Sequence, residues 1–215
     1  MARLRRYSET TMKAKPAYII GLDLGQAKDY TALCVVEHYA VEKPEDEFTL
    51  LHVRHLQRFE LGTSYPAIVA TVAKLLKREP FPLNRPTLVV DGTGVGRGVV
   101  DLFRKESLAA DLRPATITAG NSVTFEDGYT RVPKRDLVAA VQVGLQTGRL
   151  KIAASLPEAA TLTNELQNFQ VKITDAANDT YGAWREGSHD DLVLALAMAA
   201  WLAQSQGPAI GVVQW

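Results

Sequence analysis

The chain has 215 residues, which is enough for one domain whose hydrophobic core does not depend on metals or disulfides. Lys and Arg together number 24, as do Asp and Glu, so the formal net charge is zero. This balance argues against a protein that holds nucleic acid by a general positive charge, and any such affinity must come from local patches or a partner.

The N-terminal half of the chain begins with residues 1–16, which carry five basic residues and little to bury, and predict a flexible basic arm or linker. Three apolar segments follow at 18–23, 30–39 and 48–59, rich in branched and aromatic residues. The first of them ends on Asp23. Because the connections between them are short and polar, they predict an antiparallel meander.

The hydrophobic period then changes from that of strands to that of helices. Apolar residues at helical spacing between 65 and 76 predict a helix. A further apolar strand at 86–91 ends on Asp91, and a glycine-rich turn at 92–98 leads into a second helix. This alternation of strand and helix predicts parallel strands added to the meander.

The last part of the chain continues the alternation. Residues 113–118 predict another strand, and 121–131, which include Gly128, predict a hairpin or a mobile loop. Pro133 and Pro157 each begin a predicted helix, and the final helix begins near Ser188. The predicted fold class is therefore α/β, with a mixed sheet flanked by helices.

The expected domain spans residues 17–206, between the basic arm and a C-terminal tail at 207–215. The single cysteine, Cys34, excludes an internal disulfide and fits a reducing cytoplasm. No apolar run is long enough to cross a bilayer, and the basic N-terminus is not followed by the apolar segment of a secretory signal. We therefore expect a cytoplasmic protein without a membrane segment.

Acidic residues stand at the ends of predicted elements. Asp23 and Asp91 end strands, and Asp190 and Asp191 open the final helix. In an α/β sheet, ligands collect beyond the strand ends, so these carboxylates can converge although they are far apart in sequence. Close carboxylates are tolerated as anions only around a cation. Oxygen ligands without a competing His/Cys cluster favour Mg²⁺ or Mn²⁺, and two such ions suit phosphodiester hydrolysis.

Each of these acids also has a purely structural interpretation. Asp23 and Asp91 have glycine neighbours and can simply form turns. Acids at 190–191 are favoured by the dipole of the helix they open, for which Ser188 is a good N-cap. The sequence leaves open whether the acids meet.

The acidic motifs resemble those of a known family. Residues 21–25 (Gly-Leu-Asp-Leu-Gly), followed by Asp-Tyr-Thr-Ala at 29–32, resemble the first acidic motif of the nuclease domain of phage terminase large subunits. Asp-Gly-Thr-Gly-Val-Gly at 91–96 resembles the second, and Ser-His-Asp-Asp-Leu-Val at 188–193 the third. The resemblance covers residues 18–203. It implies an RNase H-like fold, related to Holliday-junction resolvases, and metal-dependent cleavage of double-stranded DNA.

The resemblance also implies roles for individual residues. Asp23, Asp91 and Asp191 would be the catalytic metal ligands, with Asp190 as a substitute or helper. His189 would shuttle a proton or orient the attacking water. Its alternative is a solvent-facing residue at the start of a helix.

A basic motif, Pro-Lys-Arg-Asp at 133–136, opens a predicted helix and resembles a motif of the same family. Lys134 and Arg135 are therefore candidates for contact with a DNA phosphate near the scissile bond, aided by the helix N-terminus. Arg97, in the glycine-rich turn, is a further candidate. For all three, a solvated surface position is the alternative.

Complete terminase large subunits carry an ATPase domain with a Gly-x-x-x-x-Gly-Lys-Ser/Thr loop. This chain has no Gly-Lys pair and cannot be a P-loop motor, so we expect an excised nuclease domain or a free-standing relative. The partners implied are double-stranded DNA and a packaging ATPase domain, portal or small terminase subunit. The location implied is the cytoplasm of an infected bacterial host.

Other classes of function stay open. Residues 21–25 also resemble the first phosphate loop of actin, Hsp70 and sugar-kinase ATP-binding domains, although these normally need two lobes. A Holliday-junction resolvase would use the same chemistry on a different substrate. A dinucleotide-binding domain is disfavoured because Val99 stands where the third glycine of its motif should be. A non-catalytic scaffold that has kept only the fold is the remaining class.

Overall fold

The computed structural model of the chain describes residues 16–25, 29–43, 46–173, 179–183 and 189–205. The predicted basic arm (apart from Pro16), the expected N-cap Ser188 and the predicted tail at 207–215 lie outside the described residues.

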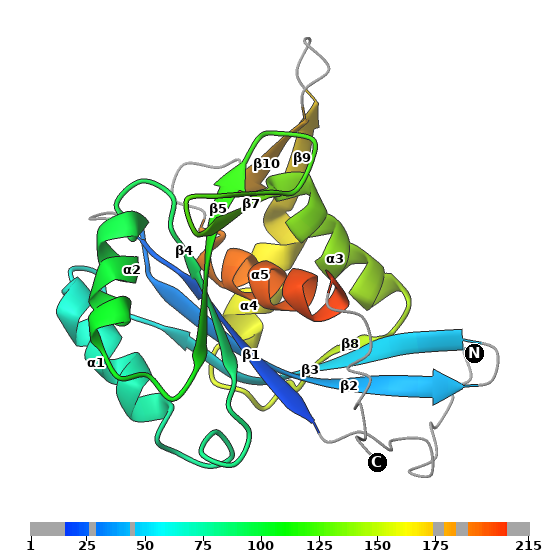
Figure 1. Cartoon of the computed structure of the whole chain (residues 1–215). Helices are drawn as coiled ribbons and strands as arrows, with labels where there is room; N and C mark the ends of the chain where they lie inside the picture. Colours follow the sequence, from blue (N-terminus) through cyan, green and yellow to red (C-terminus); the bar gives the residue numbers. More distant parts are fainter. Residues whose placement is uncertain (1–15, 26–28, 44–45, 174–178, 184–188, 206–215) are drawn as a thin grey trace.

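An eight-stranded mixed sheet forms the centre of the molecule, with the strand order β6-β7-β5-β4-β1-β2-β3-β8 (Figure 1). Its strands are β1 (Ala17–Asp23), β2 (Ala32–Lys43), β3 (Asp46–Arg58), β4 (Thr87–Asp91), β5 (Asp111–Thr118), β6 (Thr124–Glu126), β7 (Tyr129–Pro133) and β8 (Leu150–Ile152). β1, β2 and β3 pair antiparallel, which confirms the predicted meander. β4 lies parallel to β1, and β5 parallel to β4, as the strand–helix alternation indicated.

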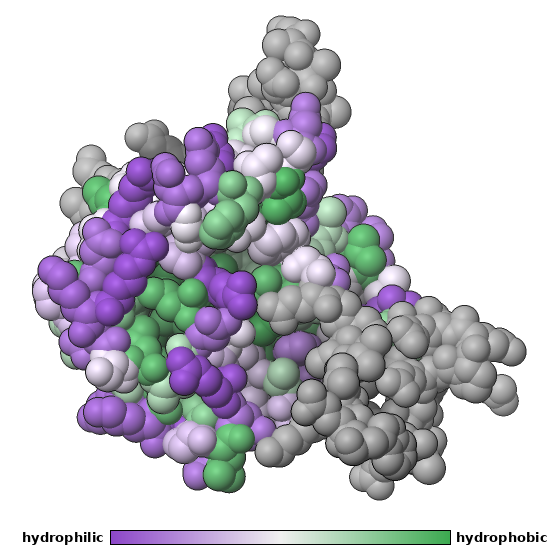
Figure 2. Space-filling view, in the orientation of Figure 1, coloured by the Kyte–Doolittle hydropathy of each residue, from purple (hydrophilic) through white to green (hydrophobic). Residues whose placement is uncertain are grey.

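Helices cover both faces of the sheet (Figure 1). They are α1 (Tyr65–Leu75), α2 (Gly96–Lys105), α3 (Lys134–Gln146), α4 (Ala159–Asn168) and α5 (Asp191–Ser205). α1 and α2 pack on one face, and α3, α4 and α5 on the other. α2 is strongly amphipathic, and Figure 2 shows the hydrophilic residues that gather over this side of the molecule. No described helix is long and apolar enough to cross a membrane.

Two apolar cores follow from this layering, because successive residues of a strand point to opposite faces. On β1, Ile20 and Leu22 join the core beneath α1 and α2, whereas Ile19 joins the core beneath α5. All three are buried. The continuous apolar run of β1 therefore reflects a strand covered on both faces, as parallel strands in α/β sheets usually are.

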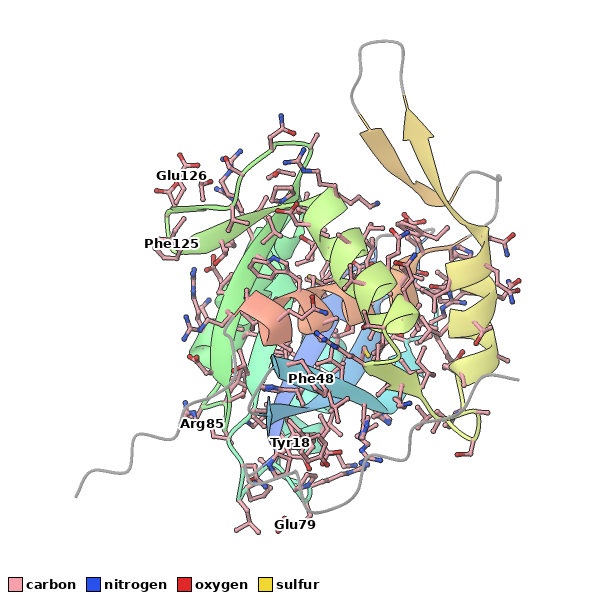
Figure 3. All side chains as sticks on the ribbon, turned by 90° about the vertical axis from the view of Figure 1, so that its right-hand side faces the viewer. Tyr18, Phe48, Glu79, Arg85, Phe125 and Glu126 are labelled. Atoms are coloured by element: carbon pink, nitrogen blue, oxygen red, sulfur yellow. The ribbon has the colours of Figure 1, made fainter. Side chains whose placement is uncertain are left out.

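The segment 121–131 forms a hairpin, one of its two predicted alternatives. β6 and β7 pair antiparallel through a turn in which Asp127 and Gly128 have φ angles of 52° and 79°. An Asp-Gly pair is among the preferred sequences for such tight turns with positive φ. The hairpin lies at the end of the molecule away from Tyr18, as the labels on Phe125 and Glu126 show (Figure 3).

Some elements were not predicted. β8 has only three residues, and it forms a strand because it pairs in parallel with β3. β9 (Phe169–Ile173) and β10 (Asp179–Ala183) form a separate two-stranded sheet. Such short strands depend on their pairing partners, and their own sequences carry little periodic signal.

Candidate metal centre

Asp23 and Asp91 occupy adjacent positions at the carboxyl ends of two parallel strands. Leu22 of β1 is the register partner of Val90 of β4. The next residue on each strand is an acid, and neighbouring strands lie about 4.8 Å apart. Because side chains alternate along a strand, Asp91 lies on the same face as Val89, which packs in the core beneath α5. The two acids therefore share the α5 face of the sheet.

Helix α5 reaches this face through a close backbone contact. A β-carbon at Gly21 would overlap the carbonyl oxygen of Ala195, so only glycine permits the approach. Asp191 lies one helical turn before Ala195, roughly 6 Å along the helix. Asp23 lies two residues after Gly21, roughly 7 Å along the strand. The start of α5 and the end of β1 thus come together.

The Asp23 carboxylate is buried among other carboxylates. The residue is 7% exposed. Burial raises its pKa well above the usual range, and repulsion from Asp91, Asp191 and Asp190 raises it further, whereas Lys134 lowers it. Among the described residues, no hydrogen bond or ion pair satisfies this carboxylate. The four acids named from the sequence therefore lie within electrostatic reach of one another.

Asp91 is held through one of its two oxygens. The backbone N–H and the hydroxyl of Thr93 donate to Oδ1 of Asp91 at 2.8 and 2.6 Å. Thr93 is fixed in turn, because its hydroxyl oxygen accepts a hydrogen bond from the backbone N–H of Ile117. Burial raises the pKa of Asp91, and the bonds from Thr93 and the charge of Lys134 oppose that rise. Oδ2 is left as the oxygen with which Asp91 can bind a ligand.

Asp191 is also held through one oxygen. Its Oδ2 lies 3.4 Å from Nη2 of Arg58 and 3.8 Å from Nδ1 of His189. Burial raises its pKa to about 6, against the lowering effect of Arg58 and His189. Asp190 is more exposed, and its Oδ2 lies 3.4 Å from Nζ of Lys134. The backbone carbonyl of Asp190 accepts the first hydrogen bond of α5, from Leu194.

The donor set matches a divalent cation in charge and ligand type, because clustered carboxylates are tolerated as anions around a positive ion. As they stand, the described side chains include no group of three or more His, Cys, Asp or Glu arranged to hold an ion. Holding one therefore requires these carboxylates to rotate towards each other. Such a rotation is open to Asp23, which has no hydrogen bond to break within the described chain.

The basic residues named from the sequence do not all lie at the acid cluster. Lys134, the first residue of α3, lies with the acids. Arg135 donates to the side chain and the backbone carbonyl of Asn121, at 2.8 and 2.6 Å, and so ties the loop before β6. The guanidinium of Arg97 lies 5.3 Å from the ring centre of Tyr129 in β7. Lys134 thus belongs to the acid cluster, whereas Arg135 and Arg97 lie beside the hairpin and its preceding loop.

Three residues around Asp191 were not assigned a role from the sequence, although one of them, Tyr30, stands in the first acidic motif. Arg58 ends β3, and its Nη2 donates to Glu165 of α4 as well as to Asp191. The Tyr30 ring contacts both Arg58 and His189, with its centre 4.5 Å from the guanidinium carbon and 5.0 Å from the centre of the His189 ring. A signal for Glu165 was present, because it shares the apolar helical spacing of Leu162, Leu166 and Phe169.

A family model described as a terminase RNase H-like domain matches residues 20–201. The large terminase nuclease from thermophilic phage G20c is similar with a TM-score of 0.60 and 20% identity, covering 88% of this chain and 83% of that chain. Its structure with bound magnesium gives 0.59 and 21% over the same shares.

The nuclease domain of the large terminase g2p from bacteriophage SPP1, with bound manganese, is also similar. It has a TM-score of 0.50 and 10% identity, covering 85% of this chain and 84% of that chain. At these identities the likeness establishes a shared fold. No curated protein matches the chain.

Proposed function

The chain belongs to the family of terminase RNase H-like domains, and we propose that it is a metal-dependent endonuclease that cleaves double-stranded DNA during viral genome packaging. The observation that carries the proposal is the placement of Asp23, Asp91 and the start of α5 at one edge of the sheet. The start of α5 has no role in the alternative ATP-binding interpretation of residues 21–25.

We infer that Asp23, Asp91 and Asp191 hold two Mg²⁺ or Mn²⁺ ions, with Asp190 as a helper. The bound magnesium and manganese of the similar nucleases support this choice of ions. When bound, such ions supply an activated water and stabilise the leaving 3′ oxygen. The chain's own contribution is to orient the ligands, since Thr93 fixes one oxygen of Asp91.

His189 is proposed to move a proton at the attacking water or to orient that water. Its Nδ1 faces Oδ2 of Asp191 at 3.8 Å, and its ring packs edgewise against Tyr30. These contacts hold the imidazole beside the acids and leave Nε2 as the nitrogen that can meet water.

Lys134, Arg135 and Arg97 are proposed to contact DNA phosphates. Lys134 is the best placed for the scissile phosphate, because its Nζ already lies among the carboxylates. Arg135 and Arg97 would contact DNA farther along, beside the β6–β7 hairpin. Proposed partners beyond the DNA are a packaging ATPase domain, a portal or a small terminase subunit, in the cytoplasm of an infected bacterial host.

The test is incubation of the full chain with supercoiled plasmid and, separately, with a four-way junction, in Mg²⁺, Mn²⁺ or EDTA. The proposal expects nicked and linear plasmid that depends on the metal. Cleavage confined to symmetric sites on the junction would favour a resolvase instead. A purified, folded protein that leaves both substrates intact with either metal would refute nuclease function.

A further inference from the structure

Helix α5 is capped by a side chain from a different helix. The first N–H groups of a helix have no partner within it and need an acceptor elsewhere. Oε2 of Glu165, in α4, accepts a hydrogen bond from the backbone N–H of Val193 at 3.1 Å, and this bond is buried. Burial raises the pKa of Glu165 to about 7, and the backbone N–H groups of Val193 and Leu192 and the charge of Arg58 oppose that rise. A carboxylate at this end of a helix is favoured by the helix dipole as well.

The other oxygen of Glu165 is used by Arg58. Nη2 of Arg58 donates to Oε1 of Glu165 and, at 3.4 Å, lies against Oδ2 of Asp191. Both oxygens of Glu165 are therefore engaged by the protein, which disfavours Glu165 as a further metal ligand. When Glu165 is ionised, its charge cancels that of Arg58, and the pair then adds no net charge to the acid cluster.

Burying the charged side chains of Arg58 and Glu165 costs free energy, and packing alone does not explain why this pair is buried. The Arg58 side chain is 17% exposed and that of Glu165 is 4% exposed. Within the described part of the chain, the buried Nε of Arg58 has no hydrogen-bond partner. A buried donor without a partner is destabilising, and such conflicts are concentrated at functional sites.

We propose that Arg58 and Glu165 are positioning residues, which hold Asp191 in the orientation that metal binding requires. Glu165 fixes the start of α5, and Arg58 ties that start to Oδ2 of Asp191. The oxygen Oδ1 is thereby left for the ion. This inference rests on the proposed metal-dependent function. Partners that orient a metal ligand contribute about tenfold to a hundredfold in metal affinity or activity.

The same strand offers a matched control pair. Arg54, four residues before Arg58 on β3, donates to the buried carboxylate of Glu37 on β2. Glu37 also accepts a hydrogen bond from the hydroxyl of Tyr18, near the start of β1 and therefore at the end away from Asp23. Breaking this pair disturbs another Arg–Glu contact with a buried glutamate, although with a more exposed arginine, and leaves α5 untouched.

The test compares Arg58→Lys and Glu165→Gln with Arg54→Lys and Glu37→Gln in the full chain. Arg58→Lys keeps the charge but loses the planar fork of donors, and Glu165→Gln keeps the volume and one acceptor. Mn²⁺ binding is measured by calorimetry, and plasmid cleavage is measured over a Mn²⁺ titration. Thermal melts followed by circular dichroism establish which variants are folded.

We expect both test variants to bind Mn²⁺ about tenfold or more weakly, and to need correspondingly more Mn²⁺ for half-maximal cleavage. High Mn²⁺ restores much of the rate, whereas the control variants keep the parent midpoint even if their melting temperature falls. If Arg58→Lys does not fold, the isosteric Glu165→Gln variant tests the positioning role by itself.

Folded test variants with the parent's Mn²⁺ midpoint, beside a parent that binds Mn²⁺ and cuts DNA, would overturn the positioning role alone. A parent that neither binds Mn²⁺ nor cuts DNA would overturn the proposed function, and the inference with it.

Discussion

Gly21 of β1 lies directly against Ala195 of α5, so closely that the helix carbonyl occupies the space that a β-carbon at position 21 would need. A β-carbon at position 21 would also lie 3.3 Å from the backbone nitrogen of Ala199, which is closer than an ordinary van der Waals contact. This contact sets how deeply α5 sits on the sheet. It therefore sets where Asp191 lies relative to Asp23.

We predict that Gly21→Ala lowers stability by about 1–3 kcal/mol, the usual cost of overpacking a core, and abolishes Mn²⁺-dependent cleavage. The loss of cleavage follows because the helix that carries Asp191 must move away from β1. Gly98→Ala is the matched control, since a β-carbon there meets open space within α2. It should keep full activity and gain up to about 1 kcal/mol. An active Gly21→Ala protein with the parent's melting temperature would contradict this account.

The acids themselves are tested by Asp23→Asn, Asp91→Asn and Asp191→Asn. Each should reduce single-turnover plasmid cleavage about a hundredfold or more, because a bound metal supplies several kcal/mol of transition-state stabilisation. Asp111→Asn removes an exposed acid from the opposite end of a neighbouring strand, where it pairs with Arg113, and should leave cleavage unchanged. Retention of the parent rate by any one of the three test variants would remove that residue from the proposed ligand set.

The roles of Asp190 and Asp191 can be distinguished by comparing one variant of each residue. Asp191 is 4% exposed and lies against Arg58 and His189, whereas Asp190 is more exposed and pairs with Lys134. We predict that Asp190→Asn reduces cleavage less than tenfold, far less than Asp191→Asn does. The reverse order would identify Asp190 as the main ligand of this pair. Calorimetric titration with Mn²⁺ should rank the two variants in the same way.

The sequence identified each acid as a candidate site residue, but it left open whether the acids lie together in the fold. Asp23 and Asp91 were recognisable because each ends an apolar run, and Asp191 because it opens an apolar helix. Their convergence depends on β4 lying parallel to β1 and on α5 crossing at Gly21. Both are long-range relationships that no local pattern contains.

The surroundings of Asp191 were less accessible to sequence reasoning. Arg58 and Glu165 are separated by 107 positions, and neither stands in a recognisable motif. A glutamate within an apolar helical face indicates a buried partner, but the sequence does not say which of 24 basic residues supplies it. Lys134 was found by its motif, yet its ion pair with Asp190 required the fold.

Lys134 offers a further prediction about electrostatics. Its charge lowers the pKa of both Asp23 and Asp91, so it partly offsets the repulsion in the metal-free cluster. We predict that Lys134→Met lowers the stability of the metal-free protein by up to about 1 kcal/mol, and that Mn²⁺ recovers most of the loss. Lys151→Met, at an exposed position of β8, should show neither effect. Equal destabilisation by Lys134→Met with and without Mn²⁺ would argue that Lys134 acts through packing.

The raised pKa values predict how the stability of the metal-free protein depends on pH. A carboxyl group with a raised pKa in the folded state contributes stability that is fully present below its unfolded value, near 3.8 for Asp. That contribution is lost as the pH rises through the folded value, which is about 6 for Asp191 and well above the usual range for Asp23. The acid cluster should therefore cost progressively more stability as the pH rises from 4.

The comparison of parent with Asp23→Asn isolates this effect. Burial lowers the pKa of His38 and His52, and these groups change stability in the opposite direction as the pH rises. Because both proteins share these histidines, their contribution cancels in the difference between the two melting temperatures. In EDTA we predict that Asp23→Asn is the more stable protein at pH 7.5, and that its advantage shrinks towards pH 4.

Mn²⁺ at pH 7.5 should reverse that order, because the parent gains the energy of binding the ion and the variant does not. Each kcal/mol corresponds to about 2–4 °C in a chain of this size, so the crossover is measurable by thermal melts. An Asp23→Asn advantage that is independent of pH would mean that Asp23 is destabilised by something other than its charge. In that case the carboxylates do not share one electrostatic cluster, and the argument for a cation between them loses its physical basis.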